Sequence, residues 1–374
     1  MSRIKTLLFV LALAAQVPLA SATVTYAVGT CESKLPSFTT IQSALDATPS
    51  PNVVKVCPGT YPEQIKITFP TTLEGISDGN LTGATIAVPS GGLVVNFTDD
   101  YGQSVAAQIL VQNASGEVNL SNLTVDGTGN NVTGSAYIWV VGVYYANSSG
   151  TMNHLTTQNQ NGNGLGVGVR MEGGSANPSV TLEDSNLQGF DDIGIRSETN
   201  SPSSELTATI KGNYLTATFP GFIANLAAIA IEPGATASVT GNLIAPGFTY
   251  GINIVDGTVS KNTAAGVGFR AISSFGASVT SNTIYNSGAV YADPAAAAIW
   301  VRSSVAPVTG NIITQSGNAG NAIDFDCTAG NNVHSNTILG AANALLNVST
   351  GTDPTNTIYS VGTLRGSQTL DECP

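Results

Sequence analysis

Charged side chains are scarce in this 374-residue chain, and basic ones are the scarcest. Lys, Arg, Asp and Glu supply 10% of the residues, with 12 basic against 24 acidic, whereas ordinary soluble domains contain about 25% charged residues. Binding to nucleic acids or anionic membranes relies on many Lys and Arg side chains that neutralise phosphates. The composition therefore argues against nucleic-acid binding and indicates a surface covered by Asn, Thr, Ser and Gly.

Long apolar runs are missing after the first 22 residues. Arg3 and Lys5 precede an apolar run over 7–15, and Ala20-Ser21-Ala22 offers the small residues that a signal peptidase reads, which predicts a secretory signal over 1–22. No later stretch reaches the roughly 20 apolar residues of a membrane-spanning helix. We expect no membrane insertion and a secreted protein, extracellular or periplasmic, with one domain over 23–374 and an oligomeric state that the sequence does not mark.

A short phrase recurs along the chain: an aliphatic residue, two small or polar residues, then Asn. Successive Asn residues are 20 to 29 positions apart, so each repeat is one structural unit of a solenoid. The phrase occurs at Ile210–Asn213, Val239–Asn242, Val259–Asn262, Val279–Asn282, Val308–Asn311 and Val333–Asn336.

Apolar-x-apolar triplets lie between these phrases. Period-two alternation predicts short strands with both apolar side chains on one face. Hairpin signals and long helical stretches are absent, which favours an all-β fold, a single right-handed parallel β-helix with coils about 4.8 Å apart. The triplets are 141–143, 167–169, 193–195, 229–231, 252–254, 299–301 and 323–325.

The recurring Asn residues have a structural interpretation. A turn Asn adopts the left-handed backbone conformation readily, and its amide hydrogen-bonds to the Asn of the next coil. Each buried amide is then satisfied by its neighbour. Extending the register towards the N-terminus places Asn122, His154 and Asn186 in the same column.

The beginning of the mature chain predicts a short capping helix over 37–45, with Thr39 or Thr40 as its N-cap. The segments Thr40-Ile41-Gln42-Ser43-Ala44 and Pro58-Gly59-Thr60-Tyr61-Pro62-Glu63 resemble the opening of the pectin-lyase-like superfamily. The resemblance implies a β-helix that acts on carbohydrates and begins with this structural motif. We assign 23–65 to an N-terminal cap and 345–374 to a C-terminal cap.

Four cysteines are present, which allows three pairings. A solenoid brings sequence neighbours together, so Cys31–Cys57 and Cys327–Cys373 are the expected disulfides, one at each end. No CxxC spacing or paired His supports a metal site, and we assign no metal ligand.

The segment 189–197, which contains Asp191, Asp192 and Arg196, resembles the Asp-Asp-strand-Lys-Ser segment of polygalacturonases, although one residue is missing between the Asp pair and the strand. The Gly-His-Gly turn and the Arg-x-Lys strand of those enzymes are missing. The Gln-Asp pair and the Asp-Phe-x-Phe-Gly segment of pectinesterases are missing too. Their absence argues against pectinesterase activity.

Residues that directly follow the triplets form a predicted surface column. It comprises Tyr144, Arg170, Arg196, Glu232, Val255, Ser273, Arg302 and Asp326. We assign Asp191, Asp192, Arg196 and Arg170 as candidate catalytic residues, and Tyr144, Glu172 and Glu232 as candidate substrate-binding residues. A lyase needs a basic proton acceptor and carboxylates that hold Ca²⁺ against an acidic sugar, so Ca²⁺ is the one cofactor to consider. The alternative is salt bridging on an exposed sheet.

Two function classes remain. The first is a secreted β-helix that binds and cleaves an extracellular polysaccharide, by lyase or glycoside hydrolase chemistry. The second is a non-catalytic extracellular rod for adhesion or envelope structure. Long segments near the Arg170 and Arg196 coils favour glycan binding.

Overall fold

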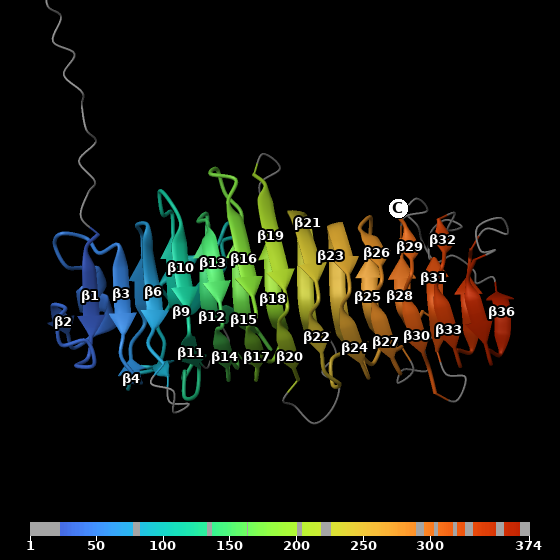
Figure 1. Ribbon diagram of the computed structural model, residues 1–374, viewed down its shortest axis with the longest axis horizontal. Coiled ribbons are helices and arrows are strands. Elements are labelled where there is room, and N and C mark those ends of the chain that lie inside the picture. Colours follow the sequence, from blue (N-terminus) through green and yellow to red (C-terminus); the bar gives the residue numbers. More distant parts are fainter. Residues whose placement is uncertain are drawn as a thin grey trace, which may run out of the picture.

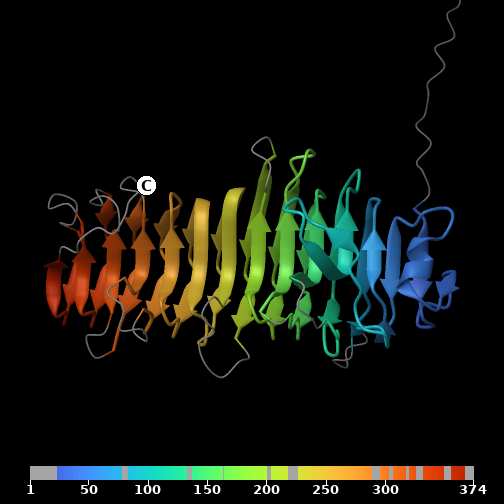
Figure 2. The same ribbon diagram turned by 180° about the vertical axis from the view of Figure 1, so that it is seen from behind.

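The computed structural model describes residues 23–77, 83–132, 137–162, 164–199, 204–217, 226–288, 295–302, 306–316, 320–325, 332–348 and 355–366. These residues form a straight rod of stacked coils, with the N-terminal coils at one end and the C-terminal coils at the other (Figures 1 and 2). The expected all-β architecture with parallel strands is confirmed. The predicted signal over 1–22 lies outside the described residues.

Each coil contributes to three faces in which strands of successive coils pair in parallel. Face 1 contains β5 (Ile65–Ile67), β9 (Ser104–Gln112), β12 (Ile138–Ala146), β15 (Gly166–Glu172), β18 (Ile193–Glu198), the first parts of β21 (Ala227–Thr240) and β23 (Tyr250–Ser260), β25 (Arg270–Ser274), β28 (Ala297–Val301), β31 (Asn321–Phe325), β34 (Asn343–Leu346) and β36 (Thr363–Gly366).

Face 2 follows face 1 in most coils, after a turn. It contains β1 (Thr25–Val28), β3 (Val53–Val56), β6 (Thr71–Gly75), β10 (Val118–Ser121), β13 (Gly150–Asn153), β16 (Ser179–Glu183), β19 (Leu206–Lys211), the second parts of β21 and β23, β26 (Ser278–Thr280), β29 (Val308–Thr309) and β32 (Val333–His334).

Face 3 is a sheet of 12 strands. It contains β4 (Gly59–Pro62), β7 (Ala84–Ala87), β11 (Leu123–Asp126), β14 (Thr156–Gln158), β17 (Asn186–Gln188), β20 (Tyr214–Thr216), β22 (Leu243–Ile244), β24 (Thr263–Ala265), β27 (Thr283–Tyr285), β30 (Ile312–Thr314), β33 (Thr337–Leu339) and β35 (Thr357–Tyr359). The remaining elements are β2 (Ser37–Phe38), helix α1 (Ile41–Leu45) and β8 (Phe97–Thr98), which pairs antiparallel with β9.

Aliphatic side chains fill the interior of the coils in stacks that run along the rod. Val169 pairs with Ile195, Ile195 with Ile229, and Ile229 with Ile252, and all four side chains are buried. Each such side chain contributes about 1.5–3 kcal/mol when it is fully removed from water. The core therefore consists of such stacks, which run inside the coils along the rod.

The sequence pattern predicted that both apolar residues of each triplet lie on one side of the strand. The early triplets do not follow this prediction. Because Val169 is equivalent to Ile229, the third residue of an early triplet matches the first residue of a late one. Val167 packs in an outer cluster, whereas Val169 lies in the core. Between them, a Cβ on Gly168 would meet a backbone oxygen of the next coil at 2.7 Å. Glycine allows this close approach of the two backbones. The core-facing position within the triplets therefore shifts by two residues between the early and the late coils.

The predicted Asn ladder is present. Asn242 Nδ2 donates to Asn262 Oδ1 at 2.9 Å and to Ile210 O at 3.0 Å, and Asn242 Oδ1 accepts from the backbone N and from Nδ2 of Asn213. These amides are buried and satisfied on both sides. The ladder runs through Asn213, Asn242, Asn262, Asn282, Asn311, Asn336 and Asn356.

The N-terminal extension of this ladder was predicted wrongly. Asn122 and His154 occupy the preceding turn position, with φ of 55° and 51°, and Asn186 is the first residue of β17. The ladder position in that coil is Ser185, whose backbone N donates to Asn213 Oδ1. The left-handed conformation thus belongs to the residue before each ladder member, as at Lys261 with φ of 57°.

The N-terminal coil contains the short helix α1, which Thr40 caps by accepting a hydrogen bond from Ser43 N. The Glu63 carboxylate accepts hydrogen bonds from Ile41 N and Gln42 N, so it supports the first turn of the helix. At the other end, β34, β35 and β36 continue the coils within the range assigned to the C-terminal cap.

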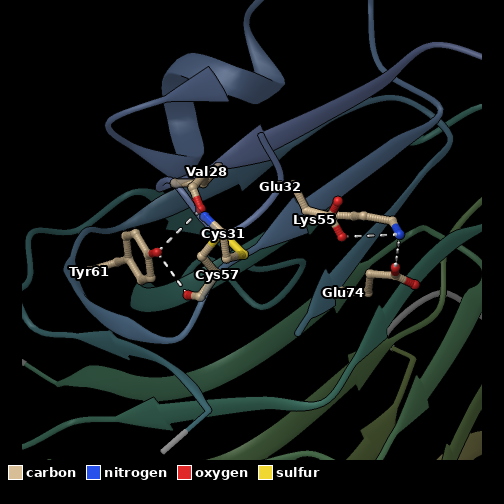
Figure 3. Close-up of a disulfide and its surroundings, with 7 residues drawn as sticks. All are labelled: Val28, Cys31, Glu32, Lys55, Cys57, Tyr61 and Glu74. Carbon is tan, nitrogen blue, oxygen red and sulfur yellow. Dashed lines mark hydrogen bonds and ion pairs between the residues drawn. A yellow bond between two sulfur atoms is a disulfide. The ribbon is translucent and has the colours of Figure 1, made fainter. Parts of the chain in front are cut away.

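The Cys31–Cys57 disulfide is confirmed, and it joins residues 26 positions apart. Tyr61 lies beside it and donates a hydrogen bond to Cys57 O at 2.8 Å (Figure 3). Lys55 lies between Glu32 and Glu74, at 3.9 and 3.7 Å (Figure 3). Cys327 and Cys373 lie outside the described residues. No helix among the described residues is long and apolar enough to cross a membrane.

Replacing one ladder amide tests the ladder directly. Asn282→Ala removes the side-chain oxygen that accepts from Asn262 and the amide group that donates to Asn311 and to the backbone oxygen of Val259. The substitution should therefore lower the free energy of unfolding by about 3–5 kcal/mol. Denaturant titration measures the loss. The control Thr283→Ala changes the adjacent, outward-facing residue and should cost less than about 1 kcal/mol. Equal losses in both variants would contradict the ladder's role.

The Cys327–Cys373 pairing remains a prediction. Thiol titration of the denatured, unreduced protein should detect no free thiol, and a digest should contain one peptide pair for each disulfide. Two free thiols per chain would exclude the second bridge. Removal of the first bridge through Cys31→Ser with Cys57→Ser should cost about 3 kcal/mol, from the chain entropy of its loop.

Candidate functional site

Arginine side chains of adjacent coils stack on the outer side of face 1. Arg170 in β15 and Arg196 in β18 pair in register, which confirms that they are neighbours, and Tyr144 in β12 precedes them. The column continues through Ala230, Asn253, Ser273, Trp300 and Asp324. Glu232, Val255 and Arg302 were predicted in this column but lie two residues beyond it, and Asp326 is outside the described residues.

The Arg170 guanidinium is buried among three carboxylates. Its Nη2 lies 2.7 Å from Asp99 Oδ2 and 3.6 Å from Glu172 Oε2, and its Nε donates to Glu198 Oε1 at 2.6 Å. Arg170 is 1% exposed and Glu172 2% exposed, and Tyr144 is fully buried. The prediction that these three lie on an exposed sheet is therefore wrong.

The segment around β8 covers this part of the column. Phe97 packs edge-to-face against Tyr144, with ring centroids 5.3 Å apart. Asp99 accepts hydrogen bonds from the backbone of the following turn, and Asp100 N donates to Glu172 Oε1 at 2.9 Å. Sequence reasoning missed Asp99 because it lies 71 residues from Arg170, and neither repeat includes it.

Arg196 lies at the edge of this buried network. Its Nη2 contacts Glu198 Oε2 at 2.8 Å, so Glu198 is shared between both arginines. The Arg196 side chain is 17% exposed, and its guanidinium lies 4.7 Å from the centroid of the Trp139 ring, within cation–π range. Of the two stacked arginines, Arg196 is therefore the one that remains partly accessible from solvent.

Two further carboxyl groups, those of Asp192 and Glu232, lie close enough to Arg196 to interact with its charge. Burial raises the pKa of Asp192 to about 7 against the opposing charge of Arg196, and Asp191 and Glu232 add smaller increases. Burial also raises the pKa of Glu232, against the same guanidinium. We call Asp192, Arg196 and Glu232 the Arg196 cluster. It contains a carboxyl group that is protonated to a substantial degree at neutral pH.

Asp191 has a different environment from Asp192. Its carboxylate accepts hydrogen bonds from the backbone N–H groups of Gly162, Gly164 and Gly166, at 2.6 to 3.1 Å. These contacts hold the loop before β15 against the start of β18. In this arrangement Asp191 positions the backbone beside the Arg196 cluster.

A cleft of about 370 Å³ lies on the other side of the buried arginine. Its walls include Phe97, Asp100, Asn147 and Glu172. Burial raises the pKa of Glu172 to about 8, and the neighbouring Glu198, Asp100 and Asp99 add to the increase against a hydrogen bond from the Asp100 backbone. The cleft is a separate polar hollow next to the same charge network.

No protein-family model and no curated protein sequence matches the chain. Solved structures match its fold. The catalytic domain of a GH87 alpha-1,3-glucanase variant in complex with tetrasaccharides has a TM-score of 0.52 at 12% identity, over 95% of this chain and 68% of that chain. A variant of the DFA-IIIase from Arthrobacter chlorophenolicus A6 in complex with DFA-III has a TM-score of 0.50 at 14% identity, over 90% and 84%. The chain is a right-handed parallel β-helix.

An alginate lyase from Paenibacillus sp. strain FPU-7 is also similar, with a TM-score of 0.45 at 16% identity over 92% of this chain and 97% of that chain. At these identities the similarity concerns the fold. The side chains of this β-helix, and not its fold, determine what it can bind or cleave.

The carboxylates of the β-helix do not fit a Ca²⁺ site. Among the described residues, no three His, Cys, Asp or Glu side chains gather as metal ligands. Asp99 and Glu198 instead direct their oxygens at Arg170, whereas Ca²⁺ takes six to eight oxygen ligands. The guanidinium of Arg170 therefore occupies the position at which these carboxylates would hold a cation.

The two tryptophans of the β-helix pack on the outer side of face 1. Trp139 lies over both arginines of the column and donates a hydrogen bond to Gln103. Trp300 is 4% exposed, and the Arg270 guanidinium lies 3.9 Å from its ring centroid. Trp300 therefore packs beneath its neighbours and does not line an open groove.

The raised pKa of Glu172 makes the stability of the β-helix depend on pH. Between its ordinary pKa of 4.5 and about 8, the folded state keeps a proton that the unfolded chain releases. This contribution is complete below pH about 4.5 and is lost as the pH rises through about 8. Glu172→Gln cannot titrate, so its melting temperature should fall less between pH 6 and 9 than that of the wild type. Glu117→Gln, on an exposed residue, should keep the wild-type slope. Parallel slopes for Glu172→Gln and wild type would refute the assignment.

Proposed function

We propose that this β-helix is a secreted carbohydrate-active protein that binds and hydrolyses an extracellular polysaccharide at the Arg196 cluster. The observation that carries the proposal is the pairing of two partly buried carboxyl groups, Asp192 and Glu232, around one partly exposed guanidinium. Glycoside hydrolases need two carboxyl groups with different protonation states. The Cys31–Cys57 disulfide supports an oxidising, extracytoplasmic compartment.

The chemistry assigns a separate role to each residue. Asp192, with its pKa near 7, donates its proton to the glycosidic oxygen as the C–O bond breaks. Glu232 accepts a proton from the attacking water, whose oxygen bonds to the anomeric carbon. Arg196, which Glu198 holds in place, orients the sugar hydroxyls between the two carboxyl groups. One water is consumed, and two shorter saccharides are released.

Hydrolysis fits the electrostatics better than lyase chemistry on an acidic sugar. The chain has a formal net charge of −12, so an anionic polysaccharide is repelled unless a cation bridges the two. A neutral polysaccharide does not meet this barrier. The tetrasaccharide complex of the GH87 alpha-1,3-glucanase provides a first substrate class to test.

A non-catalytic rod is the second candidate. The burial of Arg170 and its three carboxylates favours it, because a sealed charge network contributes to specificity of folding as well as to chemistry. In that case Arg196 completes the network and has no substrate.

Asp192→Asn tests the catalytic proposal. The variant keeps the shape of the side chain but cannot donate a carboxyl proton, so kcat/KM on alpha-1,3-glucan oligosaccharides or another cleaved neutral glycan should fall at least about 100-fold. The wild-type rate should also decline as the pH rises through about 7, where Asp192 loses its proton. Reducing-end assays across pH 4–9 measure both effects.

Glu117→Gln removes an exposed carboxylate on another coil and is the matched control for activity. Circular dichroism and melting temperature establish that Asp192→Asn remains folded. Full activity in the folded variant would refute the assignment of the acid. Retention of a glycan without any product would leave a binding module, and no response to any polysaccharide would favour the rod.

A further inference from the structure

The outer side of face 3 has an uncharged strip along the C-terminal part of the rod. In the strands from β20 to β35, the middle residue points into the core, as Ile284 and Ile313 do, and the flanking residues point outward. The outward residues are Tyr214, Thr216, Leu243, Thr263, Ala265, Thr283, Tyr285, Ile312, Thr314, Thr337, Leu339, Thr357 and Tyr359. We call this set the face 3 strip; these described positions include no charged side chain.

Large apolar side chains are exposed on the face 3 strip. Tyr285 is 43% exposed, Ile312 47% and Tyr359 59%. Exposed rings and aliphatic groups at this density normally mark a contact surface. The chain has 24 acidic residues, so the lack of charge over seven successive strands is a local property of this surface.

The register divides the strip into two rows that run parallel to the rod axis. A hydroxyl-rich row contains Thr263, Thr283, Ile312, Thr337 and Thr357, and a row with rings contains Ala265, Tyr285, Thr314, Leu339 and Tyr359. Successive members lie about 4.8 Å apart, and the rows are about 7 Å apart across the strands. Over these five strands, threonine hydroxyls therefore lie beside the side chains of Tyr285, Leu339 and Tyr359. Towards the N-terminus the first row continues through Leu243 and Tyr214.

The positions within these rows are fixed by the ladder. Asn262 and Asn282 directly precede Thr263 and Thr283, and each is hydrogen-bonded to the coils on both sides. Because the strands also pair with both neighbours, the strip is rigid before any ligand arrives. A rigid surface loses little conformational entropy when it binds an extended polymer.

The dimensions of the strip argue against a protein partner. Seven strands span about 30 Å and three residues of a strand about 10 Å, which gives roughly 300 Å². A stable protein interface needs about 800 Å² from each partner, so a second copy or another folded protein is too wide for this surface. A single extended polymer chain matches its length and width.

We propose that the face 3 strip binds a neutral polysaccharide chain that lies along the rod axis. The C–H faces of sugar rings pack on Tyr285, Leu339 and Tyr359, while the threonine row hydrogen-bonds to sugar hydroxyls. The lack of charge at these positions matches an uncharged ligand and offers nothing to an acidic one. This surface lies on a different face from the Arg196 cluster, and its binding does not depend on hydrolysis at that cluster.

A triple variant tests the strip. Tyr285→Thr, Leu339→Thr and Tyr359→Thr together remove the apolar platforms and retain residues suited to strands. Affinity gel electrophoresis with alpha-1,3-glucan, beta-1,3-glucan and mannan, and pull-down on cellulose, provide dissociation constants. We expect at least one neutral polysaccharide to retain the wild type, and alginate not to retain it. The triple variant should bind that neutral polysaccharide at least about tenfold more weakly than the wild type does.

Tyr137→Thr is the matched control, because Tyr137 is 80% exposed and precedes β12 on face 1. This control should bind like the wild type. The triple variant should keep the wild-type rate on any short oligosaccharide that the wild type cleaves, which separates the strip from the proposed hydrolysis. Unchanged binding by a folded triple variant would overturn the proposal. The proposal would also be overturned if no neutral polysaccharide retained the wild type. It would be overturned as well if light scattering detected a wild-type dimer that the triple variant does not form.

Discussion

The parallel pairing of each coil with the next is the constraint on which the rest of this structure depends. A parallel sheet that closes into coils leaves the turn backbone between faces 2 and 3 without a sheet partner, and the Asn ladder supplies one. Asn262, for example, links the coils before and after it through its backbone and its amide. A buried amide without such partners would cost about 1–3 kcal/mol. The ladder therefore keeps equivalent residues of successive coils in one line.

Alignment of this kind places like side chains on top of one another, whatever their charge. Arg170 and Arg196 are stacked because β15 and β18 are in register, and two guanidinium groups at strand spacing repel each other. Glu198 lies between them and contacts both, while Asp99 is brought in from the segment around β8. Glu198 and Asp99, neither of which the sequence analysis considered, thus neutralise part of a positive column that the fold creates.

The sequence predicted the features that repeat and failed at those that do not. The ladder from Asn213 to Asn336 and the Cys31–Cys57 bridge follow from spacing and from the proximity of neighbouring coils, and both are confirmed. Glu232 was placed in the arginine column because alternation with period two looks the same after a shift of two residues. Asp99 was not found because a segment that crosses over face 1 belongs to no repeat. The burial of Arg170 and Glu172 depends on that segment and could not be predicted either.

Burial of the first arginine also determines what the second one does. Because Arg170 and Arg196 share Glu198, the charge of Arg196 is partly compensated, and its opposing effect on Asp192 does not offset burial and the nearby Asp191 and Glu232. If Glu198 were absent, the full charge of Arg196 would act on Asp192 and favour its ionised form. Glu198 thus connects the sealed network around Arg170 to the partly exposed guanidinium beside Asp192. The buried ion pairs of Arg170 and the proposed acid at Asp192 are therefore linked through one shared carboxylate, and a substitution at Glu198 would affect both.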